Sequence, residues 1–158
     1  MYFVNKETFS THEEKKSKFI AHLVPFKQFE PLMEKLRQEH PKARHFVYAY
    51  RYLNEYNQIV ENSSDDGEPR GTSGKPSLNV LAGNELINTA VIIIRYFGGI
   101  KLGTGGLVRA YSDAVNLVIN SSELIKYEDK QKAFLSLDYS RLSKIEYLLI
   151  NLIHLLKG

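Results

Sequence analysis

The sequence predicts an α+β sandwich, in which one mixed sheet carries its helices on one face. A run of β-branched residues over 91–94 indicates a strand that is buried on both faces. Apolar residues that recur at helical spacing from Leu107 to Val118 then predict a helix over 107–121. The order of the strands and helices along the chain, which has no internal repeat, favours the α+β class.

The first part of the chain begins with a predicted strand over 19–24, which Pro25 ends. Apolar residues on one side predict a short helix over 30–39 that stops near Pro41. A second strand is predicted over 44–53, because apolar and polar residues alternate there.

A hairpin and a long loop are predicted in the middle of the chain. Asn54–Asn57 is typical of a turn that leads into a strand over 58–61. The loop over 62–74 is rich in Ser, Asp and Gly, and its length of about 13 residues indicates function or mobility. One or two helical turns over 76–81 then precede the long strand over 87–97.

The end of the chain is predicted to form one further strand and one further helix. A short strand near 124–128 closes the first part, and a strand over 132–139 leads to Ser140, a plausible N-cap for an apolar-striped helix. A lone strand and helix cannot close a core. The chain is therefore a fragment or a short form, or its end packs on the first part or on another copy. We expect self-association through the apolar helix.

Composition bounds the class of protein. The chain has 158 residues, of which 43% are hydrophobic and 25% charged, as in an ordinary globular domain. Arg95 interrupts the longest apolar run, which falls short of the roughly 20 residues that a membrane helix needs. The N-terminus has no cleavable hydrophobic segment and the chain has no cysteine. We expect a cytoplasmic protein without membrane association.

Five glycines lie within the nine residues from Gly98 to Gly106, here called the glycine segment. Such a segment between a strand and a helix can bind an anion through backbone N–H groups, and Lys101 is the side chain best placed to assist. It is not a Walker loop, because Thr104-Gly105 stands where Lys and Ser or Thr would follow. Alternatively, the glycines only let strand and helix pack closely. The sequence leaves both interpretations open.

Two blocks of sequence resemble the signature of the YigZ/IMPACT family. DDGEP occupies residues 65–69, and RYFGG followed by GGLVRAY lies within 95–111. The segment ARHFVYAYR at 43–51 is similar to the family's upstream strand. Ser73 and Ser77 depart from the alanine and the apolar residue usual there, which affects local packing only.

The resemblance implies a fold and a domain division. It implies a ribosomal protein S5 domain 2-like fold for residues 1–128, shared with elongation factor G domain IV and the galactokinase group of kinases. It also implies a second, ferredoxin-like domain, of which residues 129–158 would form about the first strand–helix unit. We therefore expect an IMPACT-like N-terminal domain and an incomplete C-terminal segment.

Basic residues gather on the glycine-rich half of the chain, whereas residues 54–68 carry acids and no Lys or Arg. Together with two aromatic residues and the glycines, they form a candidate anion-binding or nucleic-acid-binding surface. Solvated surface charge is the alternative for each residue taken singly. The candidates are Arg70, Lys75, Arg95, Tyr96, Phe97, Gly98, Gly99, Lys101, Gly103, Gly105, Gly106 and Arg109.

Arg95 ends a strand that is otherwise apolar, so its charge needs a partner or a cleft. An acid of the preceding loop, Asp65, Asp66 or Glu68, would supply the partner and tether the loop beside the glycine segment. These acids could also hold Mg²⁺, but a solvated acidic loop is preferred because no second motif supplies a base or a nucleophile. We expect no metal and no cofactor.

Two other features of the sequence have simple structural explanations. Arg109 and Asp113 are spaced for an i,i+4 ion pair. His45 is best explained as a sheet-face histidine whose hydrogen bonds are satisfied.

The family resemblance implies a link to translational regulation, so we favour a noncatalytic translation-associated protein that binds RNA, the ribosome or a translation partner. The alternative is a protein or enzyme that binds a nucleotide or another phosphorylated small molecule at the glycine segment.

Overall fold

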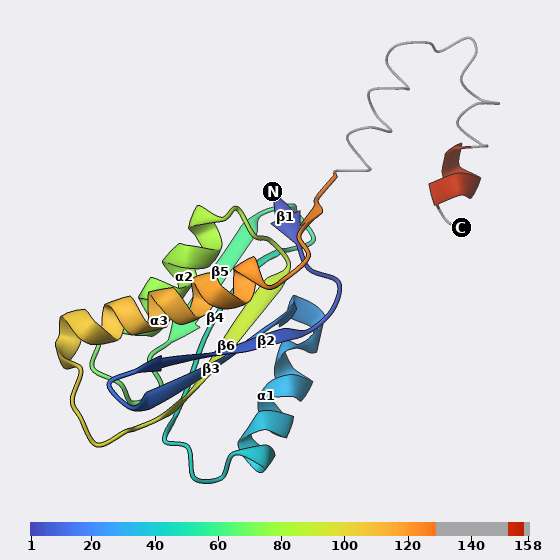
Figure 1. Ribbon diagram of the computed structural model, residues 1–158. Coiled ribbons are helices and arrows are strands. Elements are labelled where there is room, and N and C mark those ends of the chain that lie inside the picture. The colour runs from blue at the N-terminus through green and yellow to red at the C-terminus, as the bar shows by residue number, and fades with distance from the viewer. Residues whose placement is uncertain (129–151, 157–158) are drawn as a thin grey trace. The chain divides into compact units, whose positions relative to one another are not determined.

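The computed structural model describes residues 1–128 and 152–156 (Figure 1). They belong to two compact units, Met1–Lys126 and Tyr127–Gly158. In the second unit, residues 152–156 are helical and fall within the predicted C-terminal helix. The predicted strand over 132–139 and the start of that helix at Ser140 lie outside the described residues.

The first unit is built from short strands and three α-helices. The strands are β1 (Tyr2–Phe3), β2 (Thr8–Glu14), β3 (Ser17–Pro25), β4 (His45–Leu53), β5 (Ile59–Ser64), β6 (Thr89–Tyr96) and β7 (Ile125–Lys126). The helices are α1 (Phe29–Glu39), preceded by the 3-10 turn η1 (Phe26–Gln28), α2 (Gly74–Gly83) and α3 (Gly103–Asn120).

Five strands form one sheet in the order β2-β3-β6-β4-β5, and β1 pairs with β7 in a separate two-stranded ribbon. All of these pairings are antiparallel. The predicted α+β class is confirmed. The predicted mixed sheet is wrong for the described strands, because β6 enters the sheet between β3 and β4 and runs antiparallel to both.

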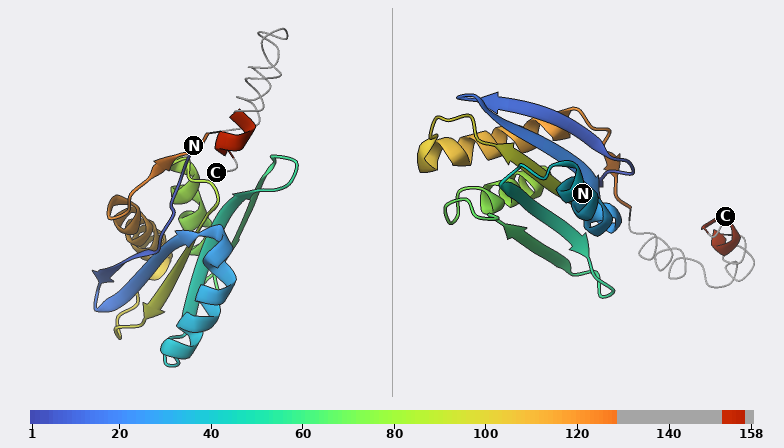
Figure 2. Two further views of the ribbon diagram at one scale, coloured as in Figure 1. Left: turned by 90° about the vertical axis from the view of Figure 1, so that its right-hand side faces the viewer. Right: turned by 90° about the horizontal axis from the view of Figure 1, so that it is seen from below.

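The sheet has a hydrophobic core on each face, and Figure 2 shows α1 on one face and α2 and α3 on the other. Val91 and Ile93 of β6 pack in one core with α2 and α3. Ile92 and Ile94, which alternate with them, pack in the other core with α1. The expectation that all helices share one face is therefore wrong. The continuous β-branched run has the composition that a strand needs when both of its faces are covered.

The strand β2 was not predicted, because it lies at the edge of the sheet and is mostly polar. It joins β3 through Lys15 and Lys16, which have positive φ values of 46° and 66°. Two positive φ values are typical of a tight hairpin turn, where Asn and Gly are the usual residues. Two lysines in this turn hide it from pattern analysis.

The helices α2 and α3 begin earlier in the chain than predicted. α2 begins at Gly74 and α3 at Gly103, so Gly105 and Gly106 lie in the first turn of α3. The expectation that the glycine segment forms an open turn as far as Gly106 is therefore wrong. None of the described helices is long and apolar enough to cross a membrane.

Candidate functional site

The acidic loop, residues 65–73, connects β5 to α2 and is held in place by its own carboxylates. Asp65 accepts hydrogen bonds from three backbone N–H groups, those of Gly71 at 2.9 Å, Ser73 at 3.1 Å and Gly74 at 2.8 Å. Two of these donors lie at the start of α2, where backbone N–H groups lack partners within the helix. Asp65 thus closes the loop and caps α2.

Asp66 attaches the loop to the start of β4. Its Oδ2 accepts a hydrogen bond from the backbone N–H of Phe46 at 2.7 Å. Its backbone carbonyl accepts one from Nδ1 of His45 at 2.8 Å. Because a carbonyl only accepts, Nδ1 of His45 carries a proton. The loop is therefore anchored to the sheet as well as to α2.

Glu68 forms a buried ionic network with Arg95 of β6 and Tyr111 of α3. Both carboxylate oxygens lie 2.8 Å from Nη1 of Arg95, and the Tyr111 hydroxyl donates to Oε2 at 2.6 Å. Glu68 is 8% exposed, Arg95 6% and Tyr111 0%. Burial, followed by the adjacent Glu68 carboxylate, raises the pKa of Tyr111, so its hydroxyl stays protonated and remains a donor.

Two further polar residues extend this network. Nε2 of His45 lies 3.3 Å from Oε1 of Glu68. The Ser17 hydroxyl accepts from Nη2 of Arg95 at 3.3 Å and from the backbone N–H of Gly98 at 3.2 Å. The network therefore joins β3, β4, β6, α3 and the acidic loop. The sequence did not indicate these hydrogen bonds of Ser17 and Tyr111, because the bonded residues lie more than 40 positions away.

The glycines of the glycine segment occupy structurally different positions. A Cβ at Gly98 would overlap the backbone of Lys16, so Gly98 allows close packing against the β2–β3 turn. Gly99 and Gly103 have φ values of 89° and 75°, which favour glycine. Gly105 is helical, and only the guanidinium of Arg109 lies near its open side, at 3.4 Å from a built Cβ.

The start of α3 suits an anion. The helix has 18 residues, no side-chain hydrogen bond at its N-cap and no acid in its first turn. Its free N–H groups and the helix dipole both favour negative charge there. Among the ion pairs between described residues none joins Arg109 to Asp113, although their spacing predicts one. Arg109 instead adds positive charge beside the first turn.

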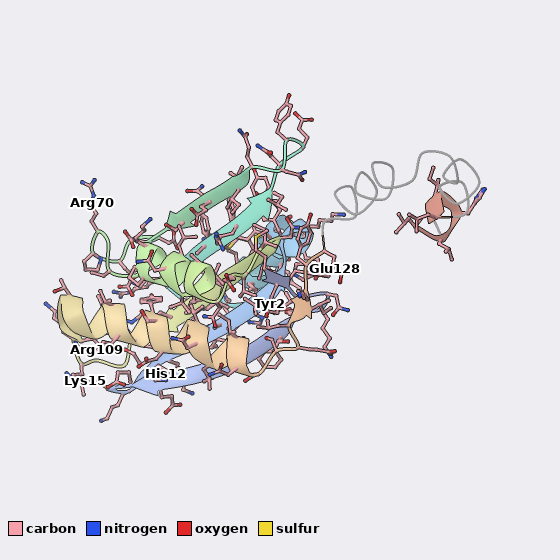
Figure 3. The ribbon with its side chains drawn as sticks, turned by 90° about the horizontal axis from the view of Figure 1, so that it is seen from above. Tyr2, His12, Lys15, Arg70, Arg109 and Glu128 are labelled. Atoms are coloured by element: carbon pink, nitrogen blue, oxygen red, sulfur yellow. The ribbon has the colours of Figure 1, made fainter. Side chains whose placement is uncertain are left out.

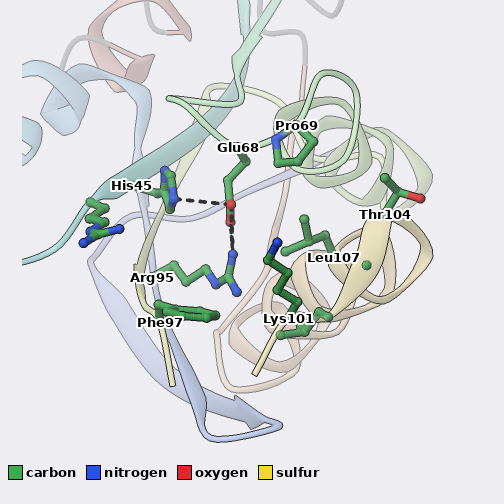
Figure 4. Close-up of a pocket in the computed structure, with 11 residues that line it drawn as sticks. His45, Glu68, Pro69, Arg95, Phe97, Lys101, Thr104 and Leu107 are labelled. Atoms are coloured by element: carbon green, nitrogen blue, oxygen red, sulfur yellow. Dashed lines mark hydrogen bonds and ion pairs between the residues drawn. The ribbon is translucent and has the colours of Figure 1, made fainter. Parts of the chain in front are cut away.

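A pocket of about 390 Å³ lies between the acidic loop, the end of β6 and the start of α3 (Figure 4). Its size is in the range of small-ligand pockets. The side chains of Arg95, Lys101 and Arg44 bring positive charge to it, and Phe97 and Leu107 bring apolar surface. The lining residues are Arg44, His45, Glu68, Pro69, Arg95, Phe97, Lys101, Leu102, Gly103, Thr104 and Leu107.

The structure brings together some of the predicted site residues and separates others. Arg95, Phe97, Lys101 and Gly103 line the pocket. Arg70, Lys75, Gly99, Gly105 and Arg109 are exposed outside its lining, and Gly98 and Gly106 are partly buried.

Tyr96 lies apart from the pocket. It packs on the α1 face of the sheet and shares a 2.6 Å hydrogen bond with Nδ1 of His40, so it does not extend the aromatic surface of Phe97. Arg44 was missed as a site residue, because it lies more than 50 residues before the glycine segment.

The acids of the loop are engaged by protein donors rather than gathered for a metal. The part of the chain that the structure describes contains no cluster of three potential metal-ligating side chains among His, Cys, Asp and Glu. Asp65 points to the start of α2, Asp66 to β4, and Glu68 to Arg95. The prediction of a solvated acidic loop is wrong for Glu68, which is buried.

Comparisons with known proteins agree with the resemblance seen in the sequence. The family model for the Impact N-terminal domain matches residues 15–119. An IMPACT family member of Haemophilus influenzae is 38% identical over 151 residues, which cover 93% of this chain and 73% of that protein. IMPACT family member YvyE of Bacillus subtilis is 39% identical over 92% of this chain and 68% of its own length.

A solved structure supports the fold. The crystal structure of a hypothetical protein aligns with a TM-score of 0.70 at 36% identity, over 78% of this chain and 62% of that chain. The chain thus spans less than two thirds of the solved protein. The match of residues 15–119 to the family model and the identity to bacterial relatives over most of the sequence show that the chain belongs to the IMPACT family.

Proposed function

We propose that the chain is a noncatalytic, translation-associated regulatory protein that binds single-stranded RNA at the start of α3. Membership of the IMPACT family supports the link to translation, because the resemblance implies such a role for its members. The proposal names RNA as the partner because phosphates are the chemistry that this surface suits.

One observation carries the proposal. The exposed cations Lys101 and Arg109 flank a helix start that has no acid in its first turn, and the exposed ring of Phe97 lines the adjoining pocket. We call these two cations, together with the exposed Arg44 of the pocket and Arg70 of the acidic loop, the basic rim. Figure 3 shows Arg70 and Arg109 at the end of the first unit where α3 begins, away from Tyr2. Phe97, 53% exposed, offers a surface on which a base can stack.

The test measures RNA affinity by fluorescence anisotropy with two unrelated single-stranded RNAs over a range of salt concentrations. Lys101→Ala and Arg109→Ala should each weaken binding of both RNAs, because phosphate contacts do not depend on sequence. Each should also reduce the slope of log affinity against log salt by about 0.7. Lys126→Ala is the matched control, because this exposed lysine lies in β7, outside the rim. RNA binding that is insensitive to salt contradicts the proposal.

A second experiment tests the proposed link to translation. Co-sedimentation of the full chain with ribosomes, before and after nuclease treatment, reports whether RNA mediates an association. We expect association that Lys101→Ala weakens and Lys126→Ala leaves unchanged. A chain that binds free RNA but neither ribosomes nor a translation factor would contradict the regulatory role and leave RNA binding standing.

We also propose a fold for each part of the chain and self-association through its C-terminal helix. The S5 domain 2-like assignment for residues 1–128 and the ferredoxin-like assignment for 129–158 rest on the family resemblance. Self-association through the apolar C-terminal helix rests on its stripe of apolar residues, of which Ile153 is 37% exposed and Leu156 38% exposed. Light scattering of the full chain against a version that ends at Glu128 tests it, with a dimer expected only for the full chain.

A further inference from the structure

We infer that the pocket at the start of α3 binds one nucleotide, with its phosphate on the helix start and its base against Phe97. The inference rests on the proposed function for one point only, the source of the nucleotide. That source is either a segment of bound RNA or a free mononucleotide. Both present a phosphate group and an aromatic base.

The phosphate end of the site combines backbone and side-chain donors. Gly103 and Thr104 line the pocket and belong to the first turn of α3, which has no side-chain cap and no acid. Lys101 and Arg44 line the same pocket, and neither forms an ion pair within the described part of the chain. A phosphate there would gain amide donors, the helix dipole and the charge of Lys101, and Arg44 adds positive charge to the same pocket.

Arg95 sets the charge on one side of the pocket. It lines the pocket, is 6% exposed, and its guanidinium pairs with Glu68. Figure 4 shows the guanidinium between the Glu68 carboxylate and the ring of Phe97, with Lys101 beside it. Glu68 offsets the charge of Arg95, so the pocket retains the positive charges of Lys101 and Arg44.

The base end of the site is apolar. Phe97 lines the pocket and is 53% exposed, and Cζ of Arg95 lies 5.6 Å from the centre of its ring. Leu107 and Pro69 also line the pocket. A cavity of about 390 Å³ is at the small end of the range for ligand sites, so it suits a single nucleotide. The combination of a flat ring and a phosphate site is what a nucleotide requires.

The experiment is calorimetric titration of the full chain with adenosine 5′-monophosphate, adenosine and inorganic phosphate. We expect the monophosphate to bind more tightly than either component alone. Thr104→Glu places an acid in the exposed first turn of α3 and should raise the Kd of the monophosphate about tenfold. Phe97→Ala should weaken the monophosphate and leave phosphate unchanged. Lys126→Ala is the control and should change nothing.

A competition with labelled single-stranded RNA separates the two sources and the two proposals. Displacement of RNA by the monophosphate identifies bound RNA as a source of the nucleotide. Monophosphate binding without displacement identifies a free nucleotide as the source. Monophosphate binding in a chain that binds no RNA supports the inference and rejects the proposed function. Salt-dependent RNA binding with no monophosphate affinity, or with no response to Thr104→Glu, rejects the inference and leaves the proposed function standing.

Discussion

The acidic loop and the glycine segment lie next to each other, and both look like functional loops in the sequence, but the structure uses them differently. The carboxylates of Asp65, Asp66 and Glu68 are all engaged by donors of the chain. In the glycine segment, Lys101 and Gly99 are exposed, and the start of α3 has no side-chain cap.

This difference shows which of the two loops has its polar side chains engaged within the protein. Side chains of the type used in catalysis stabilise the acidic loop, where each has a defined partner. The glycine segment has few polar side chains, and Lys101, Gly103 and Thr104 of this segment line a pocket. Because the carboxylates of the acidic loop already have donors within the protein, we propose the ligand site at the glycine segment.

The largest effect is expected from Glu68→Gln. The substitution leaves the buried charge of Arg95 without its counter-charge, which should lower the free energy of unfolding by about 3–5 kcal/mol. Urea denaturation measures the change. In the double variant Glu68→Gln with Arg95→Met most of the loss should return, because no unpaired charge remains. A loss below about 1 kcal/mol for Glu68→Gln would show that the network does not stabilise the loop.

Asp65→Ala is expected to have the next largest effect. It removes the acceptor of three backbone N–H groups and should lower the free energy of unfolding by about 1–3 kcal/mol. Asp113→Ala is the matched control, since Asp113 is an exposed acid, and should stay within about 0.5 kcal/mol of wild type. Equal effects of the two substitutions would contradict the assigned role of Asp65.

The glycine segment itself divides into a packed part and an open part. Gly98→Ala should cost about 1–3 kcal/mol, because its Cβ would overlap the backbone of Lys16. Gly105→Ala should be neutral or stabilise the protein by up to about 1 kcal/mol, because alanine favours a helix and only the tip of Arg109 is near. Thermal unfolding distinguishes them. Similar losses for both would mean that the open side of α3 is packed.

The smallest effect on stability is expected from Lys101→Ala. Lys101 is exposed and forms no ion pair with another described residue, so it should contribute less than about 0.5 kcal/mol to folding. The same substitution should weaken binding of RNA and of the monophosphate, so function and stability separate at this residue. Urea denaturation and anisotropy on one preparation test both. A stability loss comparable to that of Asp65→Ala would show that Lys101 stabilises the fold, which contradicts this prediction.

Most elements were predictable because their signals are local. The run over 91–94 and the stripe from Leu107 to Val118 record burial directly in residue type. The edge strand β2 was not predictable in this way, because one face of it is open and its turn contains two lysines. The same β-branched run indicates that both faces of β6 are covered. The prediction of a sheet with all helices on one face did not take this into account.

The candidate site was only partly predictable. Lys101 and Phe97 follow β6 directly, and the glycines mark a break between strand and helix, so the sequence located one wall of the pocket. It did not exclude Tyr96, because alternation along β6 continues to its end and sends neighbouring side chains to opposite faces. It also did not reveal that α3 begins at Gly103, since glycines are poor helix formers in isolation.

By itself, the sequence determined the family, the α+β class and the loops that deserve a functional hypothesis. These depend on periodicity, composition and motif, which are properties of neighbouring residues. Only the tertiary structure decided that Glu68 pairs with Arg95 and Tyr111, and that Arg44 meets Lys101 at one pocket. Such contacts join residues from separate strands and helices. Any of three acids in the loop could pair with Arg95 by sequence, and the folded loop directs Asp65 to α2 and Asp66 to β4, which leaves Glu68 within hydrogen-bond distance.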